Sequence, residues 1–240
     1  MGLKLPGRVQ IAGVIDQAEA ELIIEAGAEM LGFPLGLKDG REDLDVDEAA
    51  AIVRQMSAKA TPICITYLDT VGEIAALCGR LGARWVQLHG PMAKAEIIKL
   101  KAQDPDLGLI KSLIVKPGTE AQLLRQVHDL ESHVDAFITD TFDPESGRSG
   151  ATGKTHNWEV SRRLVSSTEK PVILAGGLTP ENVVEAIAAV HPAAVDAHTG
   201  VEDPDGRKNK ALLIDFIKHA RHGFERLGRQ NRAAPSRRLN

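Results

Sequence analysis

The chain has 240 residues and a formal net charge of −4, and 43% of its residues are hydrophobic although only 3% are aromatic. This length suits one large α/β domain or two small ones, with enough apolar side chains for a sizeable core. The acidic balance gives no reason to expect nucleic acid as a partner. No apolar run is long enough for a membrane span and no charged-then-apolar leader opens the chain, so we expect neither a membrane anchor nor a signal peptide.

Short apolar runs rich in Val, Ile and Leu recur along the whole chain and predict strands. In chain order they cover residues 8–14, 29–35, 61–68, 84–90, 107–115, 134–140, 170–177 and 192–200. The segments between them have helical spacing, as in residues 47–56, 71–82 and 180–190. Start signals support these helices, for example Asp69-Thr70 before the third, Pro91 before the fourth and Thr179-Pro180 before the seventh.

Eight strands, each followed by a helix, predict a (β/α)₈ TIM barrel, and the chain length agrees. The continuous apolar strands are typical of parallel strands that are buried on both faces. We expect one domain over residues 1–222, with a doubly wound open sheet as the competing fold. The end of the chain is rich in Arg, Gln, Asn and Pro, so residues 223–240 are predicted to be a basic, disordered tail, with a basic interaction arm as the alternative.

The two cysteines, Cys64 and Cys78, fall in apolar runs and form no Cys-x-x-Cys pair. Buried free thiols of this kind are typical of proteins in a reducing compartment. We therefore expect a cytoplasmic protein.

In a barrel of this type the chemistry lies where the strands run into the loops that follow them. These strand ends carry Ala12-Gly13, Gly32-Phe33, Ile65-Thr66-Tyr67, His89-Gly90, Lys111 or Ser112, Asp140-Thr141, Gly176-Gly177 and residues 196–200. The glycine turns after the last two strands predict a phosphate site, because glycines let backbone N–H groups approach an anion and a following helix adds its dipole. The residues concerned are Gly176, Gly177, Thr199 and Gly200.

Four segments with matching spacing carry a family resemblance: "WVQLHG" (85–90), "GATGKTHNW" (150–158), "ILAGGLTPENV" (173–183) and "VDAHTGVED" (195–203). Over roughly residues 7–222 the chain resembles phosphoribosylanthranilate isomerase, a barrel enzyme of tryptophan biosynthesis. The resemblance implies an Amadori rearrangement, in which an aminoaldose phosphate opens its ring and becomes an aminoketose phosphate. It also implies that Gly153 contributes to the phosphate site and that a small phosphorylated sugar is the partner.

The resemblance implies a general acid at Asp140, which ends the sixth strand in "FITDTF". The family's general base is a cysteine at the end of the first strand, where this chain has Ala12, and the family's lysine two residues earlier is replaced by Gln10. A methyl group accepts no proton, so either the activity is weak or another base replaces the cysteine.

His198 is the candidate replacement, because the family pattern has a small polar residue there and strands one and eight are neighbours in a closed barrel. Phosphate binding by His198 is the alternative role, since an adjacent dianion raises the pKa of an imidazole.

Further substrate contacts implied by the resemblance are Arg41, His89 and Asp196. Each has an ordinary alternative: Arg41 as an exposed partner of Glu42 or Asp43, His89 as a structural donor, and Asp196 as a residue without substrate contact. Asp140 in turn has the alternative role of a helix cap.

Three functional hypotheses remain open at this stage. The first is a phosphoribosylanthranilate isomerase with weak activity or another base. The second is an isomerase or epimerase of a different sugar phosphate, and the third is a barrel that binds a phosphorylated metabolite without turnover. A divalent metal held by His89, Asp140, Asp196 and His198 is a further alternative, but no spacing motif supports it, so we predict no metal and no cofactor. A monomer or a homodimer is expected.

Overall fold

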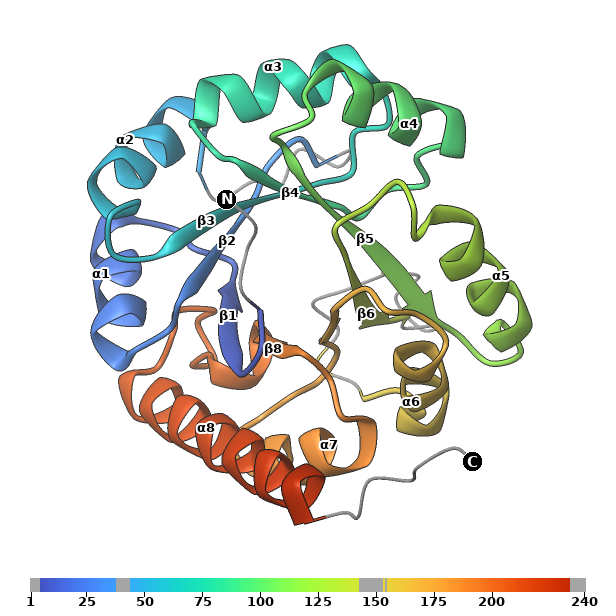
Figure 1. Cartoon of the computed structure of the whole chain (residues 1–240). Coiled ribbons are helices and arrows are strands. Elements are labelled where there is room, and N and C mark those ends of the chain that lie inside the picture. Colours follow the sequence, from blue (N-terminus) through green and yellow to red (C-terminus); the bar gives the residue numbers. More distant parts are fainter. Residues whose placement is uncertain (1–4, 38–43, 143–152, 154, 234–240) are drawn as a thin grey trace.

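The structure is a computed structural model that describes residues 5–37, 44–142, 153 and 155–233. Eight parallel strands close into a barrel in chain order, and β1 completes the ring by pairing with β8. The helices surround the barrel (Figure 1). The predicted TIM barrel is therefore confirmed, and the closure between β1 and β8 excludes the open sheet.

The strands and helices alternate along the chain as the apolar pattern predicts. The strands are β1 (Arg8–Ala12), β2 (Met30–Pro34), β3 (Thr61–Thr66), β4 (Trp85–Leu88), β5 (Gly108–Val115), β6 (Ala136–Thr141), β7 (Val172–Leu174) and β8 (Ala194–Ala197). The helices are α1 (Gln17–Ala26), α2 (Val46–Met56), α3 (Val71–Leu81), α4 (Lys94–Gln103), α5 (Glu120–Leu130), α6 (Trp158–Ser166), α7 (Val183–Val190), the short 3₁₀ helix η1 (Thr199–Val201) and α8 (Lys210–Ala233).

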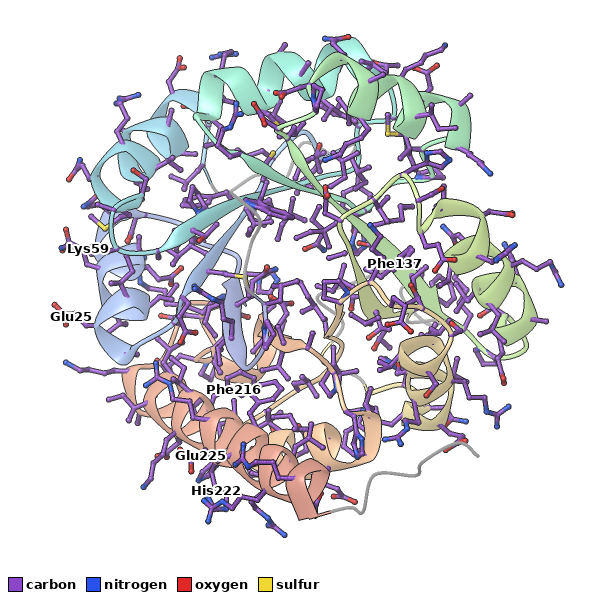
Figure 2. The ribbon with its side chains drawn as sticks, in the orientation of Figure 1. Glu25, Lys59, Phe137, Phe216, His222 and Glu225 are labelled. Atoms are coloured by element: carbon purple, nitrogen blue, oxygen red, sulfur yellow. The ribbon has the colours of Figure 1, made fainter. Side chains whose placement is uncertain are left out.

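Two apolar cores form because successive side chains of a strand point to opposite faces. The larger core lies between strands and helices and includes Phe137 of β6 and Phe216 of α8, which are both fully buried. Figure 2 shows these two phenylalanines inside the molecule, whereas Glu25 and Lys59 lie at its rim. Full burial of a side chain of this size contributes about 1.5–3 kcal/mol, so the ring of helices is held mainly by this layer.

The second core fills the inside of the barrel. It includes Met30, Ile63, Ile110 and Ile173 from four strands, and Leu5 from the segment before β1. Towards the carboxyl ends of the strands the inward side chains become polar, with Gln10 on β1, Gln87 on β4, Ser112 on β5, and Asp140 and Asp196 on β6 and β8. This change from apolar to polar marks the end of the barrel that carries the site.

Local signals explain where several helices begin. Thr70 caps α3 as expected, accepting a hydrogen bond from the backbone N–H of Glu73. The seventh helix starts later than predicted, at Val183 rather than at residue 180, because Asn182 occupies the cap position and its side chain accepts from Thr179 N at 2.9 Å. The fourth helix has Ala93 at its cap and no side-chain cap, and Pro91 lies two residues before it.

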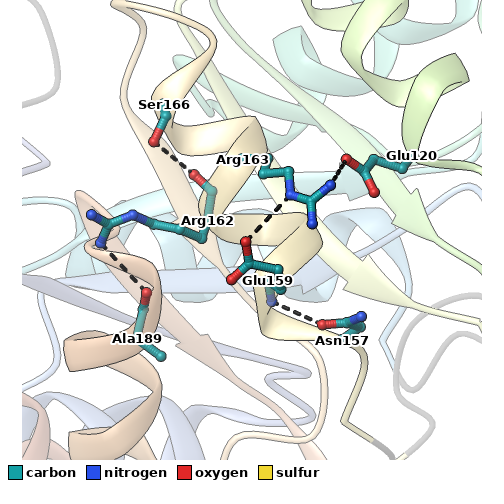
Figure 3. Close-up of polar contacts among 7 residues, drawn as sticks. All are labelled: Glu120, Asn157, Glu159, Arg162, Arg163, Ser166 and Ala189. Carbon is teal, nitrogen blue, oxygen red and sulfur yellow. Dashed lines mark hydrogen bonds and ion pairs between the residues drawn. The ribbon is translucent and has the colours of Figure 1, made fainter.

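Helix α6 is fixed to the helices on both of its sides (Figure 3). Arg163 of α6 donates to Glu120 of α5 at 2.6 Å and to Glu159 at 3.3 Å within α6. On the other side Arg162 donates to the carbonyl of Ala189 in α7 at 3.4 Å. Trp158 packs against the large core. The start of α6, where Asn157 caps the helix, therefore has a firm position next to the barrel mouth.

The last helix contradicts the predicted tail. Helix α8 runs through residue 233, so the boundary at residue 222 is wrong and residues 223–233 are helical. Leu227 is buried and Phe224 packs against the large core. Arg and Gln are good helix formers, so a composition that suggested disorder is also compatible with an amphipathic helix. The rest of the predicted tail, residues 234–240, lies outside the described residues.

Cys64 on β3 and Cys78 on α3 are buried free thiols, as predicted. A hydrogen bond with Cys78, together with burial, raises the pKa of the Cys64 thiol well above its ordinary value. Among the described helices, none combines the length and the apolar character that a bilayer crossing requires.

Candidate active site

A cavity of about 150 Å³ opens at the carboxyl ends of the strands. It brings together nearly all the residues predicted from the sequence to form the site: Asp140, His198, His89, Asp196, Gly153, Gly176, Gly177, Thr199 and Gly200. Ala12, Ile65, Tyr67, Gln87 and Leu178 complete much of the wall. Arg41 lies outside the described residues, so its predicted contact stays a prediction.

The two glycine turns form one side of this cavity. Gly176 and Gly177 have φ angles of +97° and +63°, which L side chains rarely adopt. A Cβ on Gly200 would lie 1.9 Å from the carbonyl oxygen of Leu178, so only glycine fits where these two loops touch. Within the described part of the chain, the N–H groups of Gly177, Thr199 and Gly200 donate to no backbone or side-chain acceptor. Unpaired N–H groups on adjacent loops suit an anion.

Asp140 is the penultimate residue of β6 and is buried in the wall of the cavity. Its Oδ1 accepts a hydrogen bond from the backbone N–H of Thr141 at 2.7 Å. Burial raises the pKa of Asp140 to about 7, although the hydrogen bond from Thr141 opposes this. At neutral pH a large share of this carboxyl therefore carries the proton that a general acid needs.

His198 covers the end of β1. A Cβ on Gly13 would lie 2.2 Å from His198 Nε2, so the imidazole packs directly on the backbone next to Ala12. The same Nε2 is 3.3 Å from Glu202 Oε1, and Lys208 Nζ donates to that oxygen at 2.5 Å. The histidine of β8 thus occupies the neighbourhood of β1 in which a side chain at Ala12 would have to act.

The protonation of His198 follows from its surroundings. Burial, and then the positive charge of Lys208, lower the pKa of His198 to about 3, although 29% of its side chain stays exposed. The Lys208 side chain is fully buried. In the unliganded protein the imidazole is therefore neutral throughout the physiological range.

This barrel matches one family over nearly its whole length. The family model described as N-(5'phosphoribosyl)anthranilate (PRA) isomerase matches residues 9–219. The chain belongs to this family.

Relatives and solved structures agree with this membership. N-(5'-phosphoribosyl)anthranilate isomerase 2 of Methanosarcina mazei is 37% identical over 219 residues, which are 90% of this chain and 95% of the relative. The crystal structure of phosphoribosyl anthranilate isomerase from Thermotoga maritima has a TM-score of 0.76 and 26% identity, covering 90% of this chain and 98% of that one. The enzyme from Thermococcus kodakaraensis has a TM-score of 0.72 and 28% identity, covering 89% and 98%.

In this member of the PRA isomerase family, His89 and Asp196 lie on opposite sides of the cavity. Ser112 Oγ lies 3.1 Å from His89 Nδ1, and the ring of Tyr67 lies 4.6 Å from that of His89. Burial, then the charge of Asp140, raises the pKa of Asp196 well above its ordinary value, while Gln10 and Lys208 oppose this. Both side chains are buried and polar at the cavity wall, which suits the predicted substrate contact without testing it.

Sequence reasoning missed three groups around the site of this PRA isomerase relative. Glu202 and Lys208 surround His198, and the Glu-x₅-Lys spacing after the eighth strand carries no general signal for such a pair. His156 donates or accepts at Thr141 Oγ1, 3.1 Å away, and at Ser161 Oγ, 2.6 Å away. Burial lowers the pKa of His156 to about 4. Its position beside a cap residue at the start of α6 was the available clue.

The metal alternative has no geometric support. Within the residues that the structure describes, no three His, Cys, Asp or Glu side chains converge as ligands of one ion. The four candidates His89, Asp140, Asp196 and His198 line the cavity from the ends of three strands, β4, β6 and β8.

Proposed function

We propose that the protein is an aldose–ketose isomerase that carries out the Amadori rearrangement of N-(5'-phosphoribosyl)anthranilate, with Asp140 as the acid and His198 as the base. The observation that carries this proposal is the position of His198 over Gly13, next to Ala12. Family membership supports the reaction, and the glycine turns after β7 and β8 support the phosphate of the substrate.

Each step of the reaction has a group in the required protonation state. Ring opening needs a proton on the ring oxygen, and Asp140, with a pKa raised to about 7, supplies it. Removal of the proton from the neighbouring sugar carbon then needs a base. The neutral imidazole of His198 is the proposed proton acceptor, because Nε2 of this ring lies next to Gly13 at the end of β1.

The substrate itself adjusts the base. An imidazole with a pKa of about 3 is available but weakly basic. A phosphate dianion at Gly177, Thr199 and Gly200 would lie beside His198 and raise its pKa by favouring the imidazolium. Substrate binding would thus strengthen the base in the complex in which it acts. Gly153 and Gly176 belong to the same phosphate site in this proposal, and His89, Asp196 and Arg41 hold the remainder of the substrate.

Steady-state kinetics with purified protein and N-(5'-phosphoribosyl)anthranilate tests the proposal. We expect His198→Ala to lower kcat by about 10²–10⁴-fold, the usual contribution of a general base, with KM changed far less. His198→Gln keeps a polar side chain and should retain substrate binding without turnover. His222→Ala, on the outer face of α8 (Figure 2), is the matched control and should leave kcat unchanged. Unchanged turnover in His198→Ala would eliminate His198 as the base.

A second candidate is an isomerase or epimerase of a different sugar phosphate. Ala12 favours it, because this strand end offers no acid or base of its own. Growth of a tryptophan auxotroph that lacks this isomerase separates the two. Rescue by the chain supports the first candidate, and failure of a well-expressed chain supports the second or a barrel that only binds the phosphorylated ligand.

We also infer a cytoplasmic protein that is a monomer or a homodimer. The two buried free thiols support a reducing compartment. One similar solved structure, with 25% identity and a TM-score of 0.75, is described as monomers generated from a dimeric phosphoribosylanthranilate isomerase of Thermotoga maritima, so both states are compatible with this fold.

A further inference from the structure

A chain of buried polar side chains crosses the barrel beneath the cavity. Gln10 Nε2 on β1 donates to Gln87 Oε1 on β4 at 3.3 Å, and Gln87 Nε2 donates to Ser112 Oγ on β5 at 3.4 Å. Ser112 Oγ in turn lies 3.1 Å from His89 Nδ1. All four residues are buried. The interior of a barrel is usually packed with apolar side chains. A buried series of polar side chains therefore indicates a functional role.

This series of hydrogen-bonded side chains begins at Asp196. Gln10 and Asp196 are register partners on the neighbouring strands β1 and β8, and both side chains are buried. Among the described residues, neither Gln10 Oε1 nor Asp196 Oδ1 has a hydrogen-bond donor. Two acceptor oxygens cannot satisfy each other, and an orphaned buried acceptor costs about 1–3 kcal/mol. A proton on Asp196 removes the conflict, because the carboxyl then donates to Gln10 Oε1.

The charges around Asp196 agree with a bound proton. Burial comes first and the Asp140 carboxyl on β6 second among the causes that raise the pKa of Asp196, while Gln10 and then Lys208 oppose them. His198, two residues further along, is neutral in the unliganded protein because its pKa is lowered to about 3. Of the charged groups near Asp196, only Lys208 therefore favours the carboxylate.

We propose that Gln10, Gln87 and Ser112 are positioning residues that couple the protonation of Asp196 to the tautomer of His89 on the opposite wall of the cavity. β4 and β8 are four strands apart in a ring of eight, so the chain joins opposite sides of the barrel. The inference concerns the unliganded protein, and its relevance to turnover rests on the proposed function, in which both end residues contact the substrate.

The coupling works through the direction of the hydrogen bonds. With a proton on Asp196, every bond runs the same way: Asp196 donates to Gln10, Gln10 to Gln87, Gln87 to Ser112, and the Ser112 hydroxyl to His89 Nδ1. The single proton of a neutral His89 is then on Nε2. When Asp196 loses its proton, Gln10 Nε2 turns to the carboxylate, the Gln87 amide turns with it, and Ser112 donates to Gln87. Ser112 Oγ then accepts from Nδ1–H of His89.

The proton count is simple in this scheme. Asp196 releases one proton, and His89 stays neutral while its one proton is exchanged from Nε2 to Nδ1. No proton passes through the amides, which only change orientation. Lys111 Nζ on β5 donates to the carbonyls of Leu88 and Gly90 on both sides of His89, each at 2.8 Å, and the ring of Tyr67 lies 4.6 Å from that of His89.

Nuclear magnetic resonance of unliganded protein tests the coupling directly. The ¹⁵N shifts of the two ring nitrogens report which one carries the proton, and a His89→Gln variant assigns the signals. The Asp196 carboxyl is followed over the same pH range by its ¹³C shift. We expect the proton of His89 to be on Nε2 wherever Asp196 is protonated and to move to Nδ1 at the pH where Asp196 ionises. If Asp196 keeps its proton throughout, His89 must keep the Nε2–H tautomer throughout.

Two variants interrupt this series of hydrogen bonds at different residues. Gln10→Leu and Gln87→Leu should each give a His89 tautomer that no longer follows the protonation of Asp196. Thr139→Val is the matched control: it also removes a buried polar atom without a partner among the described residues, but this atom is outside the chain. It should leave both His89 shifts unchanged.

Three results would overturn the inference: a His89 tautomer that changes independently of Asp196, an imidazolium at neutral pH, or coupling that survives in both leucine variants. None of these measurements depends on turnover, so their failure is distinct from failure of the proposed function.

Discussion

At the scale of single residues, the proposed acid, Asp140, and the proposed base, His198, have exchanged the ordinary order of their pKa values. Unperturbed Asp and His side chains have pKa values of about 3.9 and 6.5. Here burial raises the pKa of Asp140 to about 7 and, with Lys208, lowers that of His198 to about 3. Opposite shifts of this kind support the proposed roles of the carboxyl as proton donor and the imidazole as proton acceptor. Burial disfavours the charged form of both groups, so a single cause produces both assignments.

The pH profile of kcat/KM follows from this order. The free enzyme has both groups in their working states between the pKa of His198, about 3, and that of Asp140, about 7. We therefore expect kcat/KM to fall by about tenfold per pH unit once the pH exceeds the pKa of Asp140. Rates measured in one buffer system of constant ionic strength give this limb directly. A profile that stays level to about pH 9 would show that Asp140 is not the acid.

The same shift reduces the stability of the fold. The folded pKa of Asp140 is raised above the unfolded value, so the folded protein binds the extra proton and loses stability as the pH rises from about 4 to about 7. Asp140→Asn should remove this loss and be more stable than the parent by up to about 4 kcal/mol above pH 7. Urea unfolding of both proteins at acidic and alkaline pH measures the difference. An equal gain in unfolding free energy at both pH values would show that the ionisation of Asp140 is not its cause.

The sequence predicted those site residues whose signal is local. Gly176 and Gly177 follow a strand directly, and Asp140 and His198 lie at strand ends, so topology alone brings them to one mouth. Lys208 has no such signal, because its burial depends on a contact across the chain: its backbone N–H donates to Glu19 at the start of α1. The sequence did not predict the hydrogen bonds of Gln87 and Ser112. Their partners Gln10 and His89 are brought near them by the strand register, which the sequence does not show.

At the scale of elements, the segment between β8 and α8 fixes the position of His198. Glu19 accepts hydrogen bonds from Ile15 N and Lys208 N, which ties the loop after β1 to the loop after β8. Arg207 adds a bond to Asp16 at 2.6 Å. These contacts hold Lys208 and Glu202 next to His198, so the ends of β1 and β8 behave as one unit.

Lys208→Met tests this unit. Breaking a buried ion pair by removal of one partner costs about 3–5 kcal/mol, and we expect the lower end because 13% of the Glu202 side chain stays exposed. The variant should also raise the pKa of His198, since the ammonium that lowered it is gone. Urea unfolding and a histidine titration by nuclear magnetic resonance give the two values.

Two further variants serve as controls for this prediction. Lys208→Met with Glu202→Leu should recover much of the stability, because no carboxylate is then left without its partner. Arg80→Ala breaks an exposed pair with Asp47 and should cost no more than about 1 kcal/mol. Equal losses in Arg80→Ala and Lys208→Met would refute a special role for the buried pair.

At the scale of the whole molecule, α8 closes the ring of helices next to the seam between β1 and β8 (Figure 1). The barrel was predictable from eight repeats of one pattern, since each strand and helix carries its own signal. The length of α8 was not, because the apolar spacing of Phe216, Ala220, Phe224 and Leu227 continues through a segment whose composition is polar and basic. Composition averages over a window and so conceals a narrow apolar stripe.

The final turns of α8 should therefore be part of the cooperative fold. A chain that ends at residue 222 loses Phe224, whose side chain lies against Gly7, and the buried Leu227, together with the close contact of Gly223 with Ile187. By comparison with truncation of single core side chains, we expect it to unfold with a free energy about 3–5 kcal/mol below that of a chain ending at Ala233. Urea unfolding of both chains measures this, and Leu227→Ala in the longer chain should account for about 2 kcal/mol of it. Arg229→Ala, on the exposed side of the same helix, is the control and should change little. If the two chains unfold at the same urea concentration, the barrel does not need the end of α8, and residues 223–233 are an appendage as far as stability is concerned.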